Sequence, residues 1–280
     1  MRVLTWNIRW GCGCDERVDL DRITALLRTK DPDVVCLQEV ASGHPGLTGS
    51  SGEDQIALIA GRFPRYSAHF APASDLAGDD GGRRLFGNMI LSRLPVAQVL
   101  RHSLPWTAEP GVPSMPRIAI EAIVAADFGP VRVTTTHLEY YAASQRAAQV
   151  RRLRELHEEA HSHAAAPPPP DDVDPPFRHA RRTRSALICG DFNCEPGSAE
   201  LQGLVLPFDG APALKDAWTI AHGARPHAAT VGLHGCAWPD RAYCCDFFFV
   251  SEDLAPRVAR VEVDDETAAS DHQPLLLELG

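Results

Sequence analysis

The sequence predicts one α+β domain built on β-sheets, and three observations lead to this prediction. Short apolar runs of strand length alternate with amphipathic helical patterns along the 280 residues. Polar residues follow several of these runs, from one end of the chain to the other. Such positions also lie on both sides of the one long interruption, a Pro/Arg-rich segment at about residues 164–184. We therefore expect residues 1–280 to form a single domain that carries an exposed loop at this segment.

The first half of the chain begins with a predicted strand at residues 3–7. Apolar residues at helical spacing between Leu20 and Leu27 predict an amphipathic helix. Asp31-Pro32 should end that helix, because proline disfavours the helical conformation in the residue before it. A second helix is expected at residues 55–60. Further strands are expected at residues 34–37, 66–70, 88–91 and 118–126.

The second half opens with a predicted hairpin, in which the turn at residues 127–130 joins the strand 118–126 to a strand at 131–137. A helix should run from Ser144 to about His161, with Ser144 as its N-cap and with one apolar face. The four consecutive prolines and the arginines of the interruption follow. The remaining strands are expected at residues 186–189, 247–250, 258–263 and 274–279.

The composition limits the partners that the protein can attract. The net charge is −10, so a nucleic acid or a membrane would have to bind through a local basic patch. The arginines within residues 178–184, together with Arg151, Arg152 and Arg154, are the candidates for such a patch. Solvated helix and loop charges are the preferred interpretation of these arginines.

The chain shows no signal peptide and no stretch near the ~20 apolar residues that span a bilayer. We therefore expect a cytoplasmic monomer that does not bind membranes. Eight cysteines fit that compartment as reduced thiols. Neither Cys12 with Cys14 nor Cys236 with the Cys244-Cys245 pair shows C-x₂-C spacing, so a zinc site is not predicted.

Polar residues at strand ends are the most informative feature of the sequence. A single polar residue there needs no function, because turns begin at such positions and favour Asn and Asp. Six strand ends that together carry eight oxygen-ligand or histidine side chains are harder to explain in this way. The residues concerned are Asn7, Glu39, His137, Asp191, Asn193, Asp246, Asp271 and His272.

This set of side chains suits the hydrolysis of a phosphate ester. Carboxylate and amide oxygens select Mg²⁺ or Mn²⁺ over zinc or copper. Histidines donate hydrogen bonds to phosphate oxygens and move protons near neutral pH. The sequence has neither a G-x-S-x-G nucleophile elbow nor a P-loop, which argues against a serine hydrolase and a P-loop enzyme.

Five sequence blocks resemble the endonuclease/exonuclease/phosphatase superfamily, whose fold is that of DNase I, and they occur in the family's order. G-D-F-N together with the C-terminal S-D-H is the specific pair among them, and a weaker match lies at Asp246. Because the blocks span residues 5–274, the resemblance covers nearly the whole chain. The five blocks are residues 5–7, 37–39, 136–138, 190–193 and 270–274.

The resemblance implies a four-layer α/β/β/α sandwich of two packed mixed β-sheets. It implies that Glu39 is the principal metal ligand, assisted by Asn7 and Asp271, for one or two Mg²⁺ or Mn²⁺ ions. Asp191 would orient or deprotonate the attacking water. The resemblance also assigns phosphate contacts to Asn193 and His137, a transition-state role to His272 paired with Asp246, and a phosphate-facing role to Arg117.

The function that follows is a phosphodiesterase or nuclease-like hydrolase, with a phosphate-ester substrate that includes nucleic acids and nucleotides among its candidates. Two alternatives stay open at this point. The first is a phosphomonoesterase that acts on a small metabolite, since both chemistries use the same core residues. The second is a non-catalytic binding module that retains the fold. The substrate itself is not assigned, because family members differ in the loops that read it.

Overall fold

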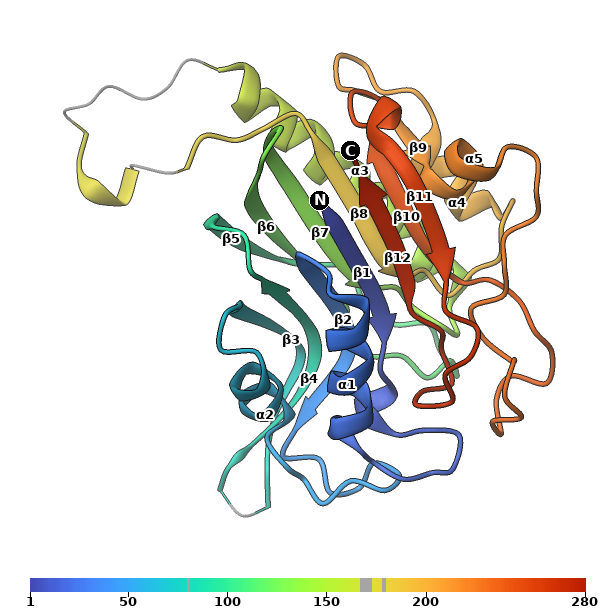
Figure 1. The fold of residues 1–280 in the computed structure, drawn as a ribbon. Coiled ribbons are helices and arrows are strands. Elements are labelled where there is room, and N and C mark those ends of the chain that lie inside the picture. Colours follow the sequence, from blue (N-terminus) through green and yellow to red (C-terminus); the bar gives the residue numbers. More distant parts are fainter. Residues whose placement is uncertain (80, 167–172, 178–179) are drawn as a thin grey trace.

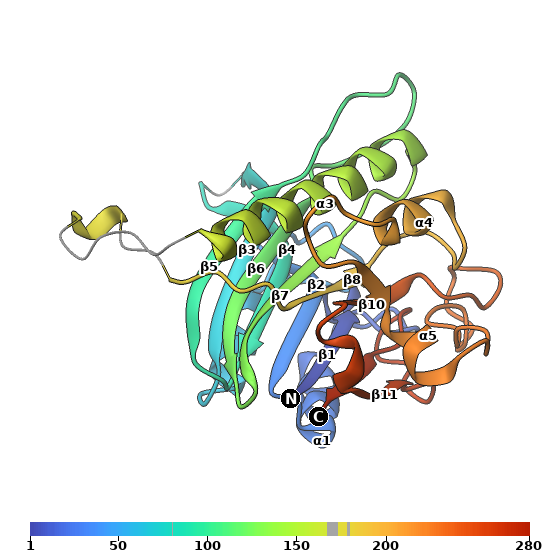
Figure 2. The ribbon, with the colours of Figure 1, turned by 90° about the horizontal axis from the view of Figure 1, so that it is seen from above.

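The computed structural model describes residues 1–79, 81–166, 173–177 and 180–280. Within this part, two six-stranded sheets pack face to face and helices cover their outer sides (Figure 1). The helices α1 (Leu20–Lys30) and α2 (Gln55–Arg62) pack on one sheet, and α3 (Ala143–Ala165) and α4 (Ala199–Val205) pack on the other. Figure 2 shows α3 and α1 on opposite sides of the sandwich. This arrangement confirms the predicted four-layer fold.

The two sheets are mixed. In the first sheet β1 and β2 run parallel and the other neighbours are antiparallel; in the second sheet only β7 and β8 run parallel. The first sheet has the order β11 (Val258–Val263), β12 (Leu275–Leu279), β1 (Arg2–Asn7), β2 (Val34–Ser42), β4 (Arg83–Ser92), β3 (Ser67–Ala77). The second has the order β5 (Val96–Ser103), β6 (Ile118–Ala126), β7 (Gly129–His137), β8 (Ala186–Asp191), β10 (Asp246–Ser251), β9 (Leu214–Asp216).

The central strands are buried on both faces, and their side chains alternate between two apolar layers. In β1, Val3 packs between the sheets, whereas Leu4 and Trp6 pack beneath α1 and α2. In β8, Leu187 packs between the sheets and Ile188 packs beneath α3 and α4. Because successive side chains of a strand point to opposite faces, a strand covered on both sides is apolar throughout. This explains why the strands appear as short continuous apolar runs in the sequence.

The parallel pairs bring the polar strand ends together. In the β1–β2 pair Asn7 lies opposite Gln38, and in the β7–β8 pair His137 lies opposite Asp191. The antiparallel strand β10 begins with Asp246 opposite Asp191. The carboxyl ends of β1, β7 and β8 and the amino end of β10 therefore meet at one end of the sandwich. Glu39 joins them from within β2, which does not end after Leu37 as predicted but continues to Ser42 after a register shift between Leu37 and Val40.

Gly190 is required where β8 reaches this end. Its φ is +131°, and a Cβ atom there would lie 1.9 Å from the carbonyl oxygen of Thr136 on the parallel strand. A larger residue would push β8 away from β7 and displace Asp191. The glycine of the G-D-F-N motif is thus explained by the close approach of two backbones.

The sequence predicted most elements, and the differences have physical causes. The elements β5, β9, α4 and α5 (Ala217–His222) were not predicted, because they are either short or half-exposed and lack a clear apolar period. Helix α1 ends at Lys30 as expected, followed by Asp31 in the left-handed conformation. The N-cap prediction for Ser144 is wrong: the cap residue is Ala142, and the Ser144 hydroxyl donates to Glu109 at 2.7 Å.

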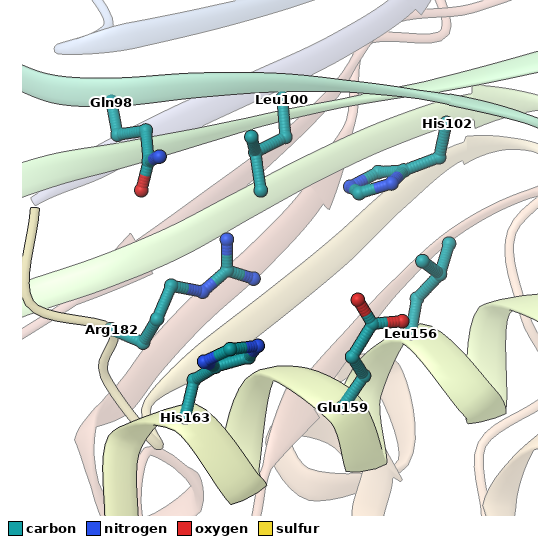
Figure 3. Close-up of a pocket in the computed structure, with 7 residues that line it drawn as sticks. All are labelled: Gln98, Leu100, His102, Leu156, Glu159, His163 and Arg182. Atoms are coloured by element: carbon teal, nitrogen blue, oxygen red, sulfur yellow. The ribbon is translucent and has the colours of Figure 1, made fainter. Parts of the chain in front are cut away.

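Much of the Pro/Arg-rich segment at 164–184, including all four prolines of the run, lies outside the described residues. In its described part, Arg182 contradicts the expectation that the arginines of this segment are solvated. The side chain of Arg182 is 8% exposed and lies 2.6 Å from the buried carboxylate of Glu121. It also lines a cavity of about 200 Å³ between β5 and α3, together with residues such as His102 and His163 (Figure 3).

Helix α3 contributes an arginine that also departs from the basic-patch idea. Arg154 donates to the backbone carbonyls of Gly203, Leu204 and Leu206, and its guanidinium lies 3.9 Å from the ring centre of Phe208. This side chain joins α3 to the end of α4. It is a structural contact and not a solvated charge or part of a patch.

A buried histidine in α3 predicts how stability depends on pH. His157 accepts from Arg132 at Nδ1 and donates from Nε2 to the carbonyl of Pro212, both at 2.9 Å, so its partners require the neutral form. Burial, followed by the charge of Arg132, lowers the pKa of His157 to about 4. Unfolded histidine titrates near 6.5. The stabilisation is therefore complete above about pH 6.5 and is lost as the pH falls toward 4.

We expect the wild type to lose about 2 kcal/mol of its free energy of unfolding between pH 7 and pH 5 through this residue. The His157→Gln variant cannot titrate there, so its urea-unfolding free energy should fall by correspondingly less over the same interval. Equal losses in the two proteins would show that His157 does not control the acid-side stability.

Two cysteines depart from the expectation of reduced thiols. Cys14 and Cys236, which are 222 residues apart, form a disulfide. The other six cysteines are free and buried. In the described residues, no helix combines the length and the apolar character that crossing a membrane requires.

Candidate active site

A cavity of about 430 Å³ opens at the end of the sandwich where the polar strand ends meet. Seven of the nine predicted site residues line it, and the other two, Asn7 and Asp246, lie directly behind and bond to lining residues. The structure therefore brings the whole predicted set together. The seven lining residues are Glu39, Arg117, His137, Asp191, Asn193, Asp271 and His272.

Asp191 lies at the centre of this arrangement and is 1% exposed. Its Oδ2 atom accepts from the Asn7 amide at 3.1 Å and lies 3.4 Å from His137 Nε2 and 3.6 Å from His272 Nε2. Its other oxygen accepts from the backbone N–H of Asn193 at 2.9 Å. Burial raises the pKa of Asp191 to about 6, although His272 acts against the increase. The carboxylate is held in one orientation and is a basic acceptor.

His272 is held from behind by Asp246. The Nδ1 atom of His272 lies 2.9 Å from Asp246 Oδ2, which also accepts from Thr230 at 2.7 Å. Burial alone would lower the pKa of His272, but the carboxylates of Asp246 and Asp191 raise it well above its ordinary value. The imidazole is therefore protonated, and its Nε2–H is directed toward Asp191 and the cavity.

His137, the second histidine of the site, is neutral where His272 is protonated. Burial, followed by the charges of Arg117 and His272, lowers the pKa of His137 well below its ordinary value. Arg117 is itself buried, with its Nε 3.4 Å from the carboxylate of Glu139. The site thus contains one neutral and one protonated histidine on either side of Asp191.

Glu39 and Asp271 form the acidic wall of the cavity. Burial and the charge of Asp271 raise the pKa of Glu39 to about 7, even though the Asn7 amide donates to it at 3.1 Å. The nearest cationic partner of Asp271 is Arg9, at 3.4 Å. The raised pKa shows that the negative charges of these crowded carboxylates repel one another, and a divalent cation between them would relieve this repulsion. Because all the donors are oxygens, the site suits Mg²⁺ or Mn²⁺.

Left-handed backbone is concentrated around the cavity. Four of the six non-glycine residues with positive φ in the described part of the chain line it: Arg9 (45°), Trp10 (43°), Glu39 (57°) and Asn193 (51°). Such conformations cost free energy in residues that have a Cβ atom and tend to cluster at functional sites. The concentration of strain independently marks this cavity as the functional site.

A second possible ligand group overlaps the site but has the wrong chemistry. Ligand atoms of Asp191, Cys245 and His272 all lie within 4.8 Å of one another. Burial raises the pKa of the Cys245 thiol well above its ordinary value, and its Sγ lies on the Nδ1 side of His272, which Asp246 occupies. A protonated thiol is a poor metal ligand, so Cys245 is a packing residue.

Five further residues line the cavity that the sequence did not reveal. Arg9 and Trp10 follow β1 directly, and Tyr140 and Tyr141 follow the His137 block, so their nearness to motif residues was the available signal. Trp238 lies in the loop between α5 and β10, where nothing in the sequence marked it. The Cys14–Cys236 disulfide fixes this loop two residues before Trp238, joining it to the segment that follows Trp10.

Comparisons with known proteins agree with this geometry. An endonuclease/exonuclease/phosphatase protein from Beutenbergia cavernae is 26% identical, with a TM-score of 0.67 over 100% of this chain and 72% of that one. A mannosyl-6-phosphatase from Bacteroides thetaiotaomicron is 17% identical, with a TM-score of 0.67 over 100% and 99% of the two chains. A humanized D. rerio TDP2 is 19% identical, with a TM-score of 0.60 over 100% and 98%.

At these identities the last two structures share the fold alone. No curated protein matched the chain. The model of the Endonuclease/Exonuclease/phosphatase family matches residues 4–272, which is almost the entire chain. Together with the sandwich fold and the grouped strand-end residues, this match shows that the chain belongs to the endonuclease/exonuclease/phosphatase family.

Proposed function

We propose that the protein is a metal-dependent phosphodiesterase. The observation that supports this most is the grouping of Asp191, His137 and His272 beside the acidic pair Glu39 and Asp271 in one cavity. Members of the family are phosphoester hydrolases and generally use divalent metal ions. A binding module would have no need for a buried, basic carboxylate between a neutral and a protonated histidine.

The residues of the chain have distinct tasks in the proposed reaction. Asp191 accepts a proton from the attacking water, whose oxygen forms a bond to phosphorus. His137, neutral and a hydrogen-bond donor, holds a phosphoryl oxygen with the assistance of Asn193. His272 donates from Nε2 to the alkoxide that leaves as the P–O bond breaks. The products are a phosphate monoester and an alcohol.

Other residues position these groups. Asp246 keeps His272 protonated and fixes its orientation, since it bonds to Nδ1 at 2.9 Å. The Asn7 amide bridges Glu39 and Asp191 at 3.1 Å each, and Glu139 holds Arg117 at the cavity wall. Arg117 then attracts the negative charge of the phosphate group.

Glu39 and Asp271, assisted by Asn7, would hold one or two Mg²⁺ or Mn²⁺ ions. Bound there, a divalent ion would supply the positive charge that the phosphoryl oxygens require in the transition state. The Asn7 oxygen currently accepts from the backbone N–H of Arg9 at 3.0 Å, so Glu39 and Asp271 are the principal candidates.

The test compares bis(p-nitrophenyl) phosphate with p-nitrophenyl phosphate, each in Mn²⁺, Mg²⁺ or EDTA. We expect metal-dependent cleavage with the diester as the better substrate. A clear preference for the monoester would instead identify a phosphomonoesterase. Metal-independent cleavage of either compound would contradict the proposed mechanism.

The cytoplasmic location and the monomeric state stay predictions. The Cys14–Cys236 disulfide weighs against the first of these, because disulfides are rare in a reducing cytosol.

A further inference from the structure

The mouth of the cavity has an aromatic wall, formed by Tyr140, Tyr141 and Trp238. The ring centres of Tyr140 and Tyr141 are 4.7 Å apart at an interplanar angle of 85°, and those of Tyr140 and Trp238 are 5.6 Å apart at 76°. The Trp238 indole N–H donates to the Tyr140 hydroxyl at 2.9 Å. The three rings therefore hold one another in place although two separate loops supply them.

This aromatic wall lies next to the proposed reaction centre. The ring centre of Trp238 is 5.9 Å from that of His272, and the two planes are inclined by only 31°. Tyr140 and Tyr141 are 39% and 62% exposed, so much of their apolar surface has no cover within the chain. Grouped aromatic surface that stays exposed at the edge of a site is typical of ligand contact.

The charges of the cavity indicate how much of a polyanion it can bind. Its lining contains two arginines and no lysine, and both arginines already face carboxylates, Arg9 with Asp271 and Arg117 with Glu139, each at 3.4 Å. A long nucleic acid needs a series of free cations along its backbone. A cavity of about 430 Å³ and this charge distribution suit a small diester instead.

We propose that the substrate is a small nucleoside phosphodiester whose base stacks on the aromatic wall while its phosphate lies at His272 and Asp191. This rests on the proposed phosphodiesterase function and specifies its substrate class. Every nucleobase has a π-face that stacks on tryptophan or tyrosine, so the wall recognises a base without reading its identity. A sugar or lipid phosphate has no aromatic face that could stack on the three rings.

The experiment uses two matched substrates in Mn²⁺: the methyl diester of thymidine 5′-phosphate, and the same diester with hydrogen in place of the base. We expect wild-type kcat/KM to be roughly tenfold or more higher for the substrate that carries the base. Trp238→Ala should remove most of this preference, because its kcat/KM should fall much further on the substrate that carries the base than on the abasic one. Trp238→Phe keeps a ring and should retain much of it.

Two further variants keep the test decisive. Tyr141→Ala changes a largely exposed side chain, so it should fold normally and still reduce the preference for the base. Trp106→Ala is the matched control, because Trp106 is 52% exposed, donates to Ser114 and does not line the cavity. Its kcat/KM on both substrates should equal that of the wild type.

The outcomes separate this inference from the function on which it rests. Equal kcat/KM for the two substrates, in a protein that cleaves bis(p-nitrophenyl) phosphate with Mn²⁺, would overturn the stacking inference and leave the phosphodiesterase function intact. An unchanged preference in both Trp238→Ala and Tyr141→Ala would also overturn it. Failure to cleave any of the diesters would overturn the proposed function, and the inference with it.

Discussion

Replacing Asp191 by asparagine is expected to lower kcat for diester hydrolysis by roughly 10²–10⁴-fold, the usual contribution of a positioned general base. The amide has nearly the same shape, but its single oxygen can keep only one of the two hydrogen bonds that Asp191 accepts, from Asn7 or from Asn193. What disappears is the buried basic oxygen that lies 3.4 Å from His137 and 3.6 Å from His272. The loss should appear in kcat much more than in Mn²⁺ affinity, because Asp191 is not one of the principal ligands in this account.

The measurement is steady-state hydrolysis of bis(p-nitrophenyl) phosphate, with calorimetric Mn²⁺ binding alongside. Asp33→Asn is the matched control. Asp33 lies immediately before β2, far from the end of the sandwich that carries Glu39. It accepts a hydrogen bond from the backbone N–H of Arg2 and forms an ion pair with Arg93. Its kcat should not change. If Asp191→Asn also turns over at the wild-type rate, Asp191 has no part in the chemical step.

Replacing Glu39 by glutamine is expected to weaken Mn²⁺ binding by more than about 100-fold, since even the loss of an outer-shell partner costs about 10–100-fold in affinity. Activity should be lost at low metal concentration. Without metal, however, the variant should be at least as stable as the wild type. The folded-state pKa of Glu39 is raised to about 7, so above the unfolded value of about 4.3 its ionised form destabilises the fold.

These opposite effects distinguish a ligand from a residue that merely maintains the structure. The melting temperature at pH 8 in EDTA is the relevant measurement, with Glu278→Gln as the control, since Glu278 pairs with Arg2 away from the cavity. A Glu39→Gln protein that melts well below the wild type in EDTA and binds Mn²⁺ with unchanged affinity would assign Glu39 a structural role.

The sequence predicted the grouping of the site because apolar strand patterns end at functional residues. Asn7, Glu39, His137 and Asp191 each follow such a run, and parallel pairing places the ends of neighbouring strands at one edge. The grouping within each sheet follows from strand pairing, and the face-to-face packing of the two sheets adds the contact between Asn7 and Asp191. Neither of these depends on the conformation of any loop.

Loop-dependent features could not be predicted in the same way. The pairing of Cys14 with Cys236 joins residues 222 apart, and no spacing rule indicates it. Trp238 reaches the cavity only because its loop folds back over His272. Arg182 was expected in solvent, but the buried carboxylate of Glu121 supplies a partner that the sequence does not reveal.

The wrong cap prediction has a local cause. Ser144 stands before a helical apolar pattern, as an N-cap would, but the helix already begins at Ala143. The hydroxyl then bonds to Glu109 in a loop that is distant in sequence. Tertiary contacts thus override a signal that is favourable only locally.

The most direct test of metal-dependent diester hydrolysis is the rate at which metal-stripped wild type cleaves bis(p-nitrophenyl) phosphate as Mn²⁺ is added back. We expect no measurable turnover in EDTA and a saturable return of activity with added Mn²⁺. Full activity in EDTA, or no activity at any Mn²⁺ concentration, would contradict this expectation.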